Sequence, residues 1–246
     1  MEELENVAAA RLPITKIIGV GEYGEAAVRH LNAFMFKDVD FDEENRAQIK
    51  YAFSDVRVSH FVTKAILADA DIVIVIADAN GEEAAIEIAS SAKRAKKLSV
   101  LLTNAIDDKL IAACDCALEI STLDDIENAA GVVLNPCYCI GIIGIDWIDV
   151  QRQLTEAKRG YLLTGTGETV NDAIDDALSK ADSAVLRDAS VACVDAICQT
   201  ALTGSEADEI LSIAKRLRGD CEAYFNVMLR TDADSGCKIN IILADC

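Results

Sequence analysis

Basic residues are scarce in this chain of 246 residues. There are 23 Lys and Arg against 42 Asp and Glu, which gives a formal net charge of −19. Binding to nucleic acid or to an anionic membrane surface requires clustered Lys and Arg, so this balance argues against both kinds of partner. No apolar run reaches the roughly 18 to 20 residues of a membrane span, and we expect no direct membrane insertion.

Proline and histidine are also rare, with only two of each. There is no long Pro/Gly/Ser-rich linker, so structured chain must join the two halves. His30 and His60 have no G-x-S-x-G motif to accompany them, which leaves a Ser–His–Asp hydrolase without support. The first ten residues lack the basic region of a signal peptide, and we expect a cytoplasmic protein.

Nine cysteines are present, mostly in apolar contexts. In a reducing compartment they are expected to be small buried hydrophobic residues. Two C-x-C pairs, Cys114/Cys116 and Cys137/Cys139, have an alternative role. On strands each pair would place both sulfurs on one face, and four thiolates could hold zinc or an iron–sulfur cluster. Because zinc sites usually have C-x₂₋₄-C spacing, this pattern is a poorer match, and both interpretations stay open.

Strands and helices alternate in the first half, which favours a doubly wound parallel sheet. The run DIVIVIA at 71–77 is continuous and β-branched, as in a strand covered on both faces. We expect further strands at 14–20, 37–41, 98–103 and 114–120, with helices at 25–36 and 82–97.

The second half has the pattern of a smaller α+β domain. We expect helices at 122–134, 149–161, 168–180 and 206–217, and strands at 190–197, 224–231 and 238–243. Ser205 is the expected N-cap of the last helix. The TGTG sequence at 164–167 is interpreted as a glycine turn before a helix.

A glycine-rich loop, GVGEYG at 19–24, ends the first strand and opens a helix. Backbone N–H groups at such a helix start can bind phosphate. A dinucleotide-binding enzyme would show the same pattern, with an acidic residue such as Asp38 or Asp40 contacting the ribose. A tight strand–helix turn without a ligand is the third interpretation.

This loop, extended as GVGEYGEAAV at 19–28, resembles the first nucleotide loop of FtsZ. Four further segments resemble the same family in the same order. GIDWIDV at 144–150 is similar to the FtsZ loop that carries two catalytic acids. The others are the strand–helix–strand at 70–103, the glycine turn and helix at 160–177, and the helix and strands at 203–245. The resemblance to the FtsZ/tubulin family runs from about residue 14 to 245.

The resemblance implies a Rossmann-like doubly wound sheet domain at 12–126, a connecting helix and acidic loop at 127–150, and an α+β domain at 151–246. In this family GTP binds the first domain and subunits stack head to tail. The acidic loop then touches the next subunit's nucleotide, where carboxylates orient water. Asp146 and Asp149 match the two catalytic acids, while Gly144 stands where the family has Asn.

The implied ligands are GTP or GDP with Mg²⁺. The implied nucleotide-binding residues are Gly19, Gly21, Glu22, Tyr23, Gly24, Asp78, Asn80 and Gly81. The segment DANGEE at 78–83 departs from the family, because it has one glycine where the family has a GGGTGTG stretch. Few N–H groups can converge there, and Glu82 and Glu83 would repel a triphosphate unless Mg²⁺ offset the charge.

The leading hypothesis is therefore an FtsZ/tubulin-like cytoskeletal or cell-division protein of a prokaryotic cytoplasm. It would self-assemble head to tail, or dock on a related filament, with a degraded GTP site and weak or absent hydrolysis. One alternative is an active GTPase with a remodelled phosphate loop and Asp146 and Asp149 acting in trans. Another is a Rossmann-type dinucleotide-binding enzyme. Both acids also have a simple structural interpretation, as the acidic start of a helix.

Overall fold

The structure is a computed structural model. It describes residues 11–37, 39, 41–54, 67–155, 157–198, 203–217, 221–229 and 236–244. Strands from both halves of the chain form one ten-stranded sheet in the order β2-β1-β3-β4-β5-β7-β10-β8-β9-β6. Three residues considered in the sequence analysis, His60, Asp38 and Asp40, lie outside the described residues.

The first half of the sheet is parallel throughout. Its strands are β1 (Thr15–Val20), β2 (Ile49–Ser54), β3 (Ile72–Ala77), β4 (Leu98–Thr103) and β5 (Cys116–Glu119). Every residue of β3 is buried, as its apolar run predicts. The strand expected at 37–41 lies partly outside the described residues. Phe41 makes an isolated bridge to Cys139, and the second strand, which pairs with β1, is β2.

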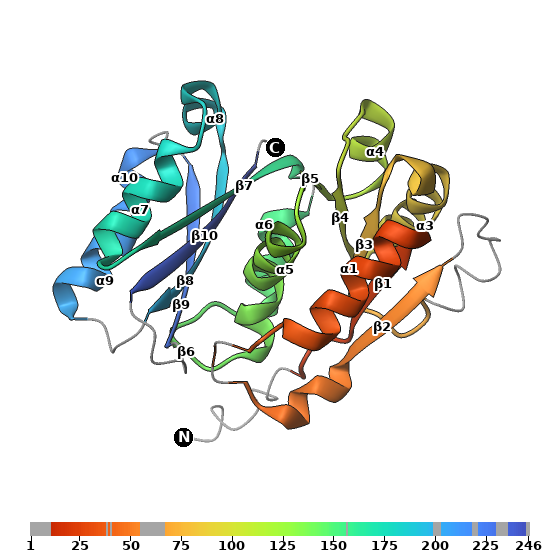
Figure 1. Cartoon of the computed structure of the whole chain (residues 1–246), viewed down its shortest axis with the longest axis horizontal. Helices are drawn as coiled ribbons and strands as arrows, with labels where there is room; N and C mark the ends of the chain where they lie inside the picture. The colour runs from red at the N-terminus through yellow and green to blue at the C-terminus, as the bar shows by residue number, and fades with distance from the viewer. Residues whose placement is uncertain are drawn as a thin grey trace, which may run out of the picture.

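Helices cover both faces of this half, which confirms the doubly wound arrangement (Figure 1). Two of them, α1 (Gly21–Phe34) and α5 (Leu123–Tyr138), share one hydrophobic core with alternate residues of the strands. On the opposite face lie α3 (Glu82–Arg94) and α4 (Asp108–Ala113). Short 3₁₀ turns, η1 (Glu43–Gln48) and η2 (Ala79–Gly81), precede β2 and α3.

The second half of the sheet is mixed. Its strands are β6 (Gly141–Ile143), β7 (Lys158–Gly167), β8 (Val191–Cys198), β9 (Glu222–Leu229) and β10 (Cys237–Ala244). Parallel pairing of β5 with β7 joins the two halves. Strands β9 and β10 follow one another in the chain but are not neighbours, because β8 lies between them.

The helices of this half are α6 (Trp147–Leu154), α7 (Val170–Ser179), α8 (Ser183–Asp188), α9 (Gly204–Leu211) and α10 (Ile213–Arg216). Three expectations are corrected. The helix expected at 149–161 stops at Leu154, and β7 follows. TGTG is the end of β7 instead of a turn. Thr203, instead of Ser205, caps α9 through a capping box with Glu206.

Helix α5 lies between the two halves, in the middle of Figure 1. It packs on α1 and also on β8 and β10, so its core includes Cys193, Met228 and Ile242 from the second half. The second core lies on the other face of this sheet, under α7, α9 and α10. The fold class predicted from the sequence is confirmed. Within the described residues, no helix is long and apolar enough to cross a membrane.

Candidate nucleotide loops and acidic loop

The glycine loop lies at the carboxyl end of β1, where α1 begins. Gly19 and Gly24 are in close contact: a Cβ on Gly19 would lie 2.2 Å from the Gly24 carbonyl oxygen, and one on Gly24 would lie 2.3 Å from the Ile76 oxygen. The absence of side chains therefore lets the first turn of α1 lie directly on β1 and β3. Gly21 has φ of 71°, a conformation that glycine adopts at little cost. These glycines have a packing role whether or not a ligand binds.

The second predicted loop, after β3, lies beside the first. A Cβ on Gly81 would approach the Val20 side chain to 2.9 Å. The Asp78 carboxylate accepts hydrogen bonds from the backbone N–H of Asn80 (3.1 Å) and of Gly81 (3.2 Å). The Asn80 amide also donates to Asp78, at 3.2 Å. The N–H groups that could bind a phosphate in this loop are thus occupied by the chain's own carboxylate.

The start of α1 differs, because its N-cap, Val20, makes no side-chain hydrogen bond. Backbone N–H groups of the first turn are consequently not capped by a side chain. Glu22, in that turn, is exposed. The first loop thus has no side-chain acceptor on its donors, whereas Asp78 holds the Asn80 and Gly81 N–H groups of the second loop, although the N-cap of α3, Gly81, makes no side-chain hydrogen bond either.

Tyr23 lies between these loops and the start of α5. Its ring packs against the first core, and its buried hydroxyl has no hydrogen-bond partner among the described residues. Burial raises the pKa of Tyr23, and the charges of Asp78 and Asp125 raise it further. Asp125 is in the first turn of α5, so the amino end of that helix faces the loops. Sequence patterns did not indicate this approach of Asp125.

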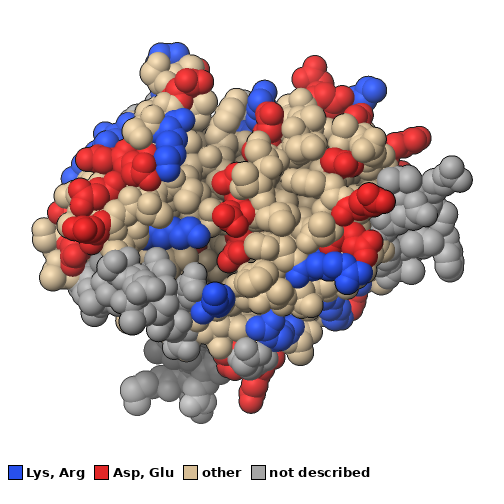
Figure 2. Space-filling view, viewed as in Figure 1, with Lys and Arg blue, Asp and Glu red and all other residues tan. Residues whose placement is uncertain are grey.

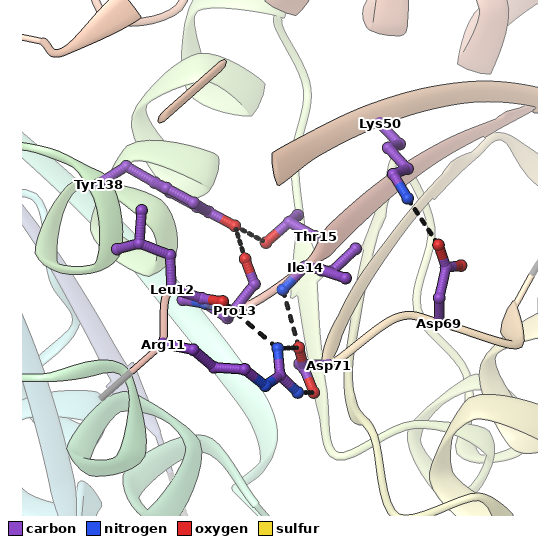
Figure 3. A network of polar contacts seen from close by, with 9 residues as sticks. All are labelled: Arg11, Leu12, Pro13, Ile14, Thr15, Lys50, Asp69, Asp71 and Tyr138. Atoms are coloured by element: carbon purple, nitrogen blue, oxygen red, sulfur yellow. Dashed lines mark hydrogen bonds and ion pairs between the residues drawn. The ribbon is translucent and has the colours of Figure 1, made fainter. Parts of the chain in front are cut away.

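The carboxyl end of α5 lies at the opposite edge of the sheet. The Tyr138 hydroxyl donates to the Pro13 carbonyl oxygen at 2.8 Å and is also hydrogen-bonded to the Thr15 hydroxyl at 2.8 Å, at the amino end of β1 (Figure 3). Beside them, Arg11 makes two 2.8 Å hydrogen bonds to Asp71. Burial alone would raise the pKa of Asp71, but Arg11 and the Ile14 N–H together lower it. At this end of the molecule, hydrogen bonds join parts of the chain that are distant in sequence.

The predicted catalytic acids belong to this amino edge, since only β6 and a short loop separate them from Tyr138. Asp146 is the N-cap of α6 and accepts from the Asp149 N–H at 2.9 Å. Asp149 pairs with Arg152, which also contacts the Tyr224 hydroxyl at 2.8 Å. At about 1.5 Å per residue, the 16 residues of α5 put roughly 24 Å between these acids and the glycine loop. The structure does not bring the two predicted sites together within one chain.

Neither a family sequence model nor a curated protein sequence matches the chain. Solved structures match it along nearly its whole length. A point mutant of FtsZ from M. jannaschii aligns with a TM-score of 0.78 and 13% identity over 95% of this chain and 91% of the other. CetZ1 from Haloferax volcanii, a GDP-bound monomer, aligns at 0.60 and 11%, covering 94% and 93%.

TubZ from Bacillus thuringiensis serovar israelensis, in GDP-form protofilaments, aligns at 0.59 and 9%, covering 94% and 84%. The chain has an FtsZ/tubulin-like fold. At these identities the comparison establishes the fold only, and the function of the candidate site has to be argued from its geometry. In this FtsZ/tubulin-like chain the Asn80–Gly81 donors do not fit a phosphate as they stand, because Asp78 holds them.

The C-x-C pairs do not build a metal site. Cys114 ends α4 and packs in the core under α3, whereas Cys137 is within α5 and packs in the core on the other face. Of these four cysteines only Cys116 lies on a strand, β5, so the condition for each pair to present both sulfurs on one strand face is not met. Among the described residues, no group of three or more His, Cys, Asp or Glu side chains could hold a metal ion.

Proposed function

We propose that this protein is a cytoskeletal protein of FtsZ/tubulin type that self-associates head to tail or docks on a related filament, with a degraded GTP site and weak or absent hydrolysis. The observation that carries the proposal is the Asp78 carboxylate on the N–H groups of Asn80 and Gly81. An anion that belongs to the chain already fills the place where a nucleotide phosphate would bind.

A triphosphate would have to displace Asp78 and then remain near several carboxylates. Glu22, Glu82 and Glu83 lie in the first turns of α1 and α3, beside the two loops. At about 5 Å and an effective dielectric near 20, each pair of like unit charges costs roughly 3 kcal/mol before screening. Mg²⁺ would offset only part of this repulsion. The charge balance therefore supports weak nucleotide binding.

Assembly is supported by the separation of the two predicted sites. Asp146 and Asp149 are too far from the glycine loop to act on a ligand in the same chain, by roughly the length of α5. They could meet such a loop only on a second copy or a related subunit. Among the neighbours, the TubZ structure is of protofilaments, which is consistent with assembly as a use of this fold.

Charge is distributed in a way that favours head-to-tail contact. Segments at the carboxyl ends of β1, β3, β4 and β5 contain one basic residue, Lys109, and many acidic ones: Glu22, Glu25, Asp78, Glu82, Glu83, Asp107, Asp108, Asp124 and Asp125. Segments at the amino ends of the parallel strands are mixed. They contain most of the basic residues, namely Arg11, Lys16, Arg46, Lys50, Lys93, Arg94, Lys96 and Lys97, together with the acidic Asp42, Glu44, Asp69, Asp71, Asp115, Asp146 and Asp149.

Figure 2 shows acidic side chains on the left, centre and right of the face, and several basic ones along its lower part. Because the carboxyl-end segments carry far more negative charge than the amino-end segments, stacking copies in one direction brings fewer like charges together than stacking carboxyl end against carboxyl end. We expect such contacts to weaken as salt rises, because exposed charges are screened beyond about 8 Å at physiological ionic strength.

One observation favours the active GTPase as a second candidate. The start of α1 has no side-chain cap, so its donors remain open to an anion. In that case Asp78 would rotate away when GTP–Mg²⁺ binds, and the acids of a neighbouring copy would complete the site.

The deciding experiment replaces Asp78 with Ala and compares this variant with one in which a similar capping aspartate is replaced. Asp107 caps α4 after β4 in the same manner, with hydrogen bonds of 3.0 and 2.9 Å from Lys109 and Leu110 N–H. Calorimetric titration with GTP–Mg²⁺ should show little binding to the parent chain and to Asp107→Ala, but at least tenfold tighter binding to Asp78→Ala. Equal, micromolar affinity in all three would refute the degraded site.

Assembly is measured separately, by sedimentation velocity of the nucleotide-free chain at low and high salt. Larger species at low salt that dissociate at high salt support the proposal. A chain that stays monomeric at every salt and protein concentration, alone and with a purified FtsZ-type filament, would exclude assembly.

A further inference from the structure

Two cysteines face each other across the second half of the sheet. Cys198 is the last residue of β8, Cys237 is the first residue of β10, and the antiparallel register pairs them directly. Residues paired in this way project on the same face, with Cβ atoms about 4.5–5.5 Å apart. Their Cα atoms are about 4.5 or 5.5 Å apart, depending on the hydrogen-bonding position, and both values lie within the range of a disulfide.

Both residues are reduced, with no disulfide between them, and belong to the core under α7 and α9. The Cys198 thiol is hydrogen-bonded to Cys237, and this bond is the main reason that the pKa of Cys198 lies far above its ordinary value. Burial and the charge of Glu206, on α9, act in the same direction. The two thiols therefore form one hydrogen-bonded pair, in the contact from which a disulfide can close.

Solvent access favours Cys237 as the attacking thiol. It is 9% exposed, while Cys198 is 1% exposed. It follows Gly236, whose φ of 99° marks a sharp change of chain direction at the start of β10. The first residue of a strand opens more readily than its middle, so a small reagent can reach this sulfur by local fraying.

We propose that Cys198 and Cys237 form a redox-active dithiol that closes reversibly into a cross-strand disulfide. The co-reactant is a low-molecular-weight disulfide such as glutathione disulfide. The Cys237 thiolate attacks one sulfur of this disulfide, forms a mixed disulfide and expels one thiolate. Cys198 then loses its proton and attacks the Cys237 sulfur, which expels the second thiolate. The protein loses two electrons and two protons, and the small disulfide becomes two thiols.

This modification is independent of the proposed assembly. Two of the other described thiols are hydrogen-bonded to backbone carbonyls instead. Cys114 donates to the Leu110 carbonyl and Cys137 to the Val133 carbonyl, and burial raises the pKa of both. The disulfide would close a long loop between β8 and β10. We expect it to raise the melting temperature by roughly 5–10 °C, since closing a loop of this length restricts the unfolded chain.

The test uses the full chain, reduced and then equilibrated at pH 8 in glutathione buffers of increasing oxidised fraction. Free thiols are alkylated, and the peptides are mapped by mass spectrometry. The expected result is loss of two thiols, a peptide that joins Cys198 to Cys237, and full reversal by dithiothreitol. Cys114→Ser is the matched control, and it should form the same bond.

Two variants keep the proposal falsifiable. Cys198→Ser should accumulate a glutathione adduct on Cys237, whereas Cys237→Ser should leave Cys198 reduced. Circular dichroism of each variant establishes that it is folded before oxidation. Should the folded parent chain keep both thiols at every glutathione ratio, or oxidise other cysteines first, the proposal is wrong.

Discussion

Two strand–helix units of this molecule use glycine in the same way, but the first turns of their helices are capped differently. In the first half, Gly19 and Gly24 let α1 lie on β1 and β3. In the second half, Gly165 and Gly167 let α7 lie on β7, and a Cβ on Gly165 would lie 2.0 Å from the Ala173 oxygen. Both patterns look like phosphate loops in the sequence. Here each glycine pair is used for close packing between a helix and a strand.

The difference between the units lies at the start of each helix. Helix α7 has a complete capping box, in which Thr169 accepts from the Asp172 N–H and Asp172 accepts from the Thr169 N–H. Helix α1 has no side-chain cap. Only the first unit therefore leaves donors open for an anion, and glycine content alone does not distinguish the two.

The largest expected effect comes from adding one methyl group at either contact. Gly165→Ala and Gly24→Ala each force a Cβ into backbone atoms, and each should lower the free energy of unfolding by at least about 3 kcal/mol. Urea denaturation gives the values. Gly144→Ala is the control, since nothing lies within 4 Å of its Cβ position, and it should change stability by under about 0.5 kcal/mol. A tolerated Gly24→Ala with a damaging Gly165→Ala would break the comparison.

A second contrast concerns a carboxyl group buried in the second half. Asp195, on β8, accepts 2.7 Å hydrogen bonds from Asn135 of α5 and Asn226 of β9. Burial raises its pKa to about 6, although the two amides lower it in part. Between about pH 4 and 6 the folded chain keeps this proton while the unfolded chain has lost it. Stability from this group is therefore present at low pH and is lost as pH rises.

The corresponding variant is Asp195→Asn, which does not titrate. Relative to this variant, the parent chain should lose about 2 to 3 kcal/mol of unfolding free energy between pH 4 and 7. Denaturation of both chains at four pH values measures the difference. A difference that stays constant across this range would show that Asp195 does not titrate there.

The capping box gives a smaller effect. Thr169→Ala should destabilise the chain by about 1 kcal/mol, because the Asp172 N–H loses the Thr169 hydroxyl oxygen as its acceptor. Thr203→Ala, which breaks the matching box of α9, should cost a similar amount. Thermal unfolding of both variants tests this. A negligible change in Thr169→Ala would remove the distinction between the capped and uncapped helices.

The smallest expected effect lies in the acidic loop, away from both glycine units. Asp149→Ala breaks a partly exposed ion pair with Arg152 and should change stability by no more than about 0.5 kcal/mol. Its sedimentation at low salt is the informative measurement. Reduced association at unchanged stability would separate a role in assembly from a local role in the helix.

Most elements of the fold could be predicted because their patterns are local. The run at β3 and the helix α7 follow directly from apolar periodicity. Strand β7 was missed, since glycine at 165 and 167 is a turn signal in sequence and becomes a strand residue only through its contact with α7. The position of β8 between β9 and β10 depends on long-range pairing, which local patterns do not encode.

The candidate site was predictable in part for the same reason. The nearness of the loops at Gly19 and Asp78 follows from the parallel strands that precede them. The capping role of Asp78 depends on the length of one loop, and the approach of Asp125 depends on where α5 crosses the sheet. The pairing of Cys198 with Cys237 depends on strand register, for which the sequence contains no local signal.

The place of β10 has a consequence for synthesis. This strand is the latest one in the described chain, and it lies between β7 and β8. Until the ribosome has released it, two long strands each expose an unpaired edge, and the core shared with α5 lacks Ile242. Such edges are sites of aggregation. The nascent chain is therefore most prone to aggregate before β10 has joined the sheet, and deleting residues 237–244 would expose both edges again.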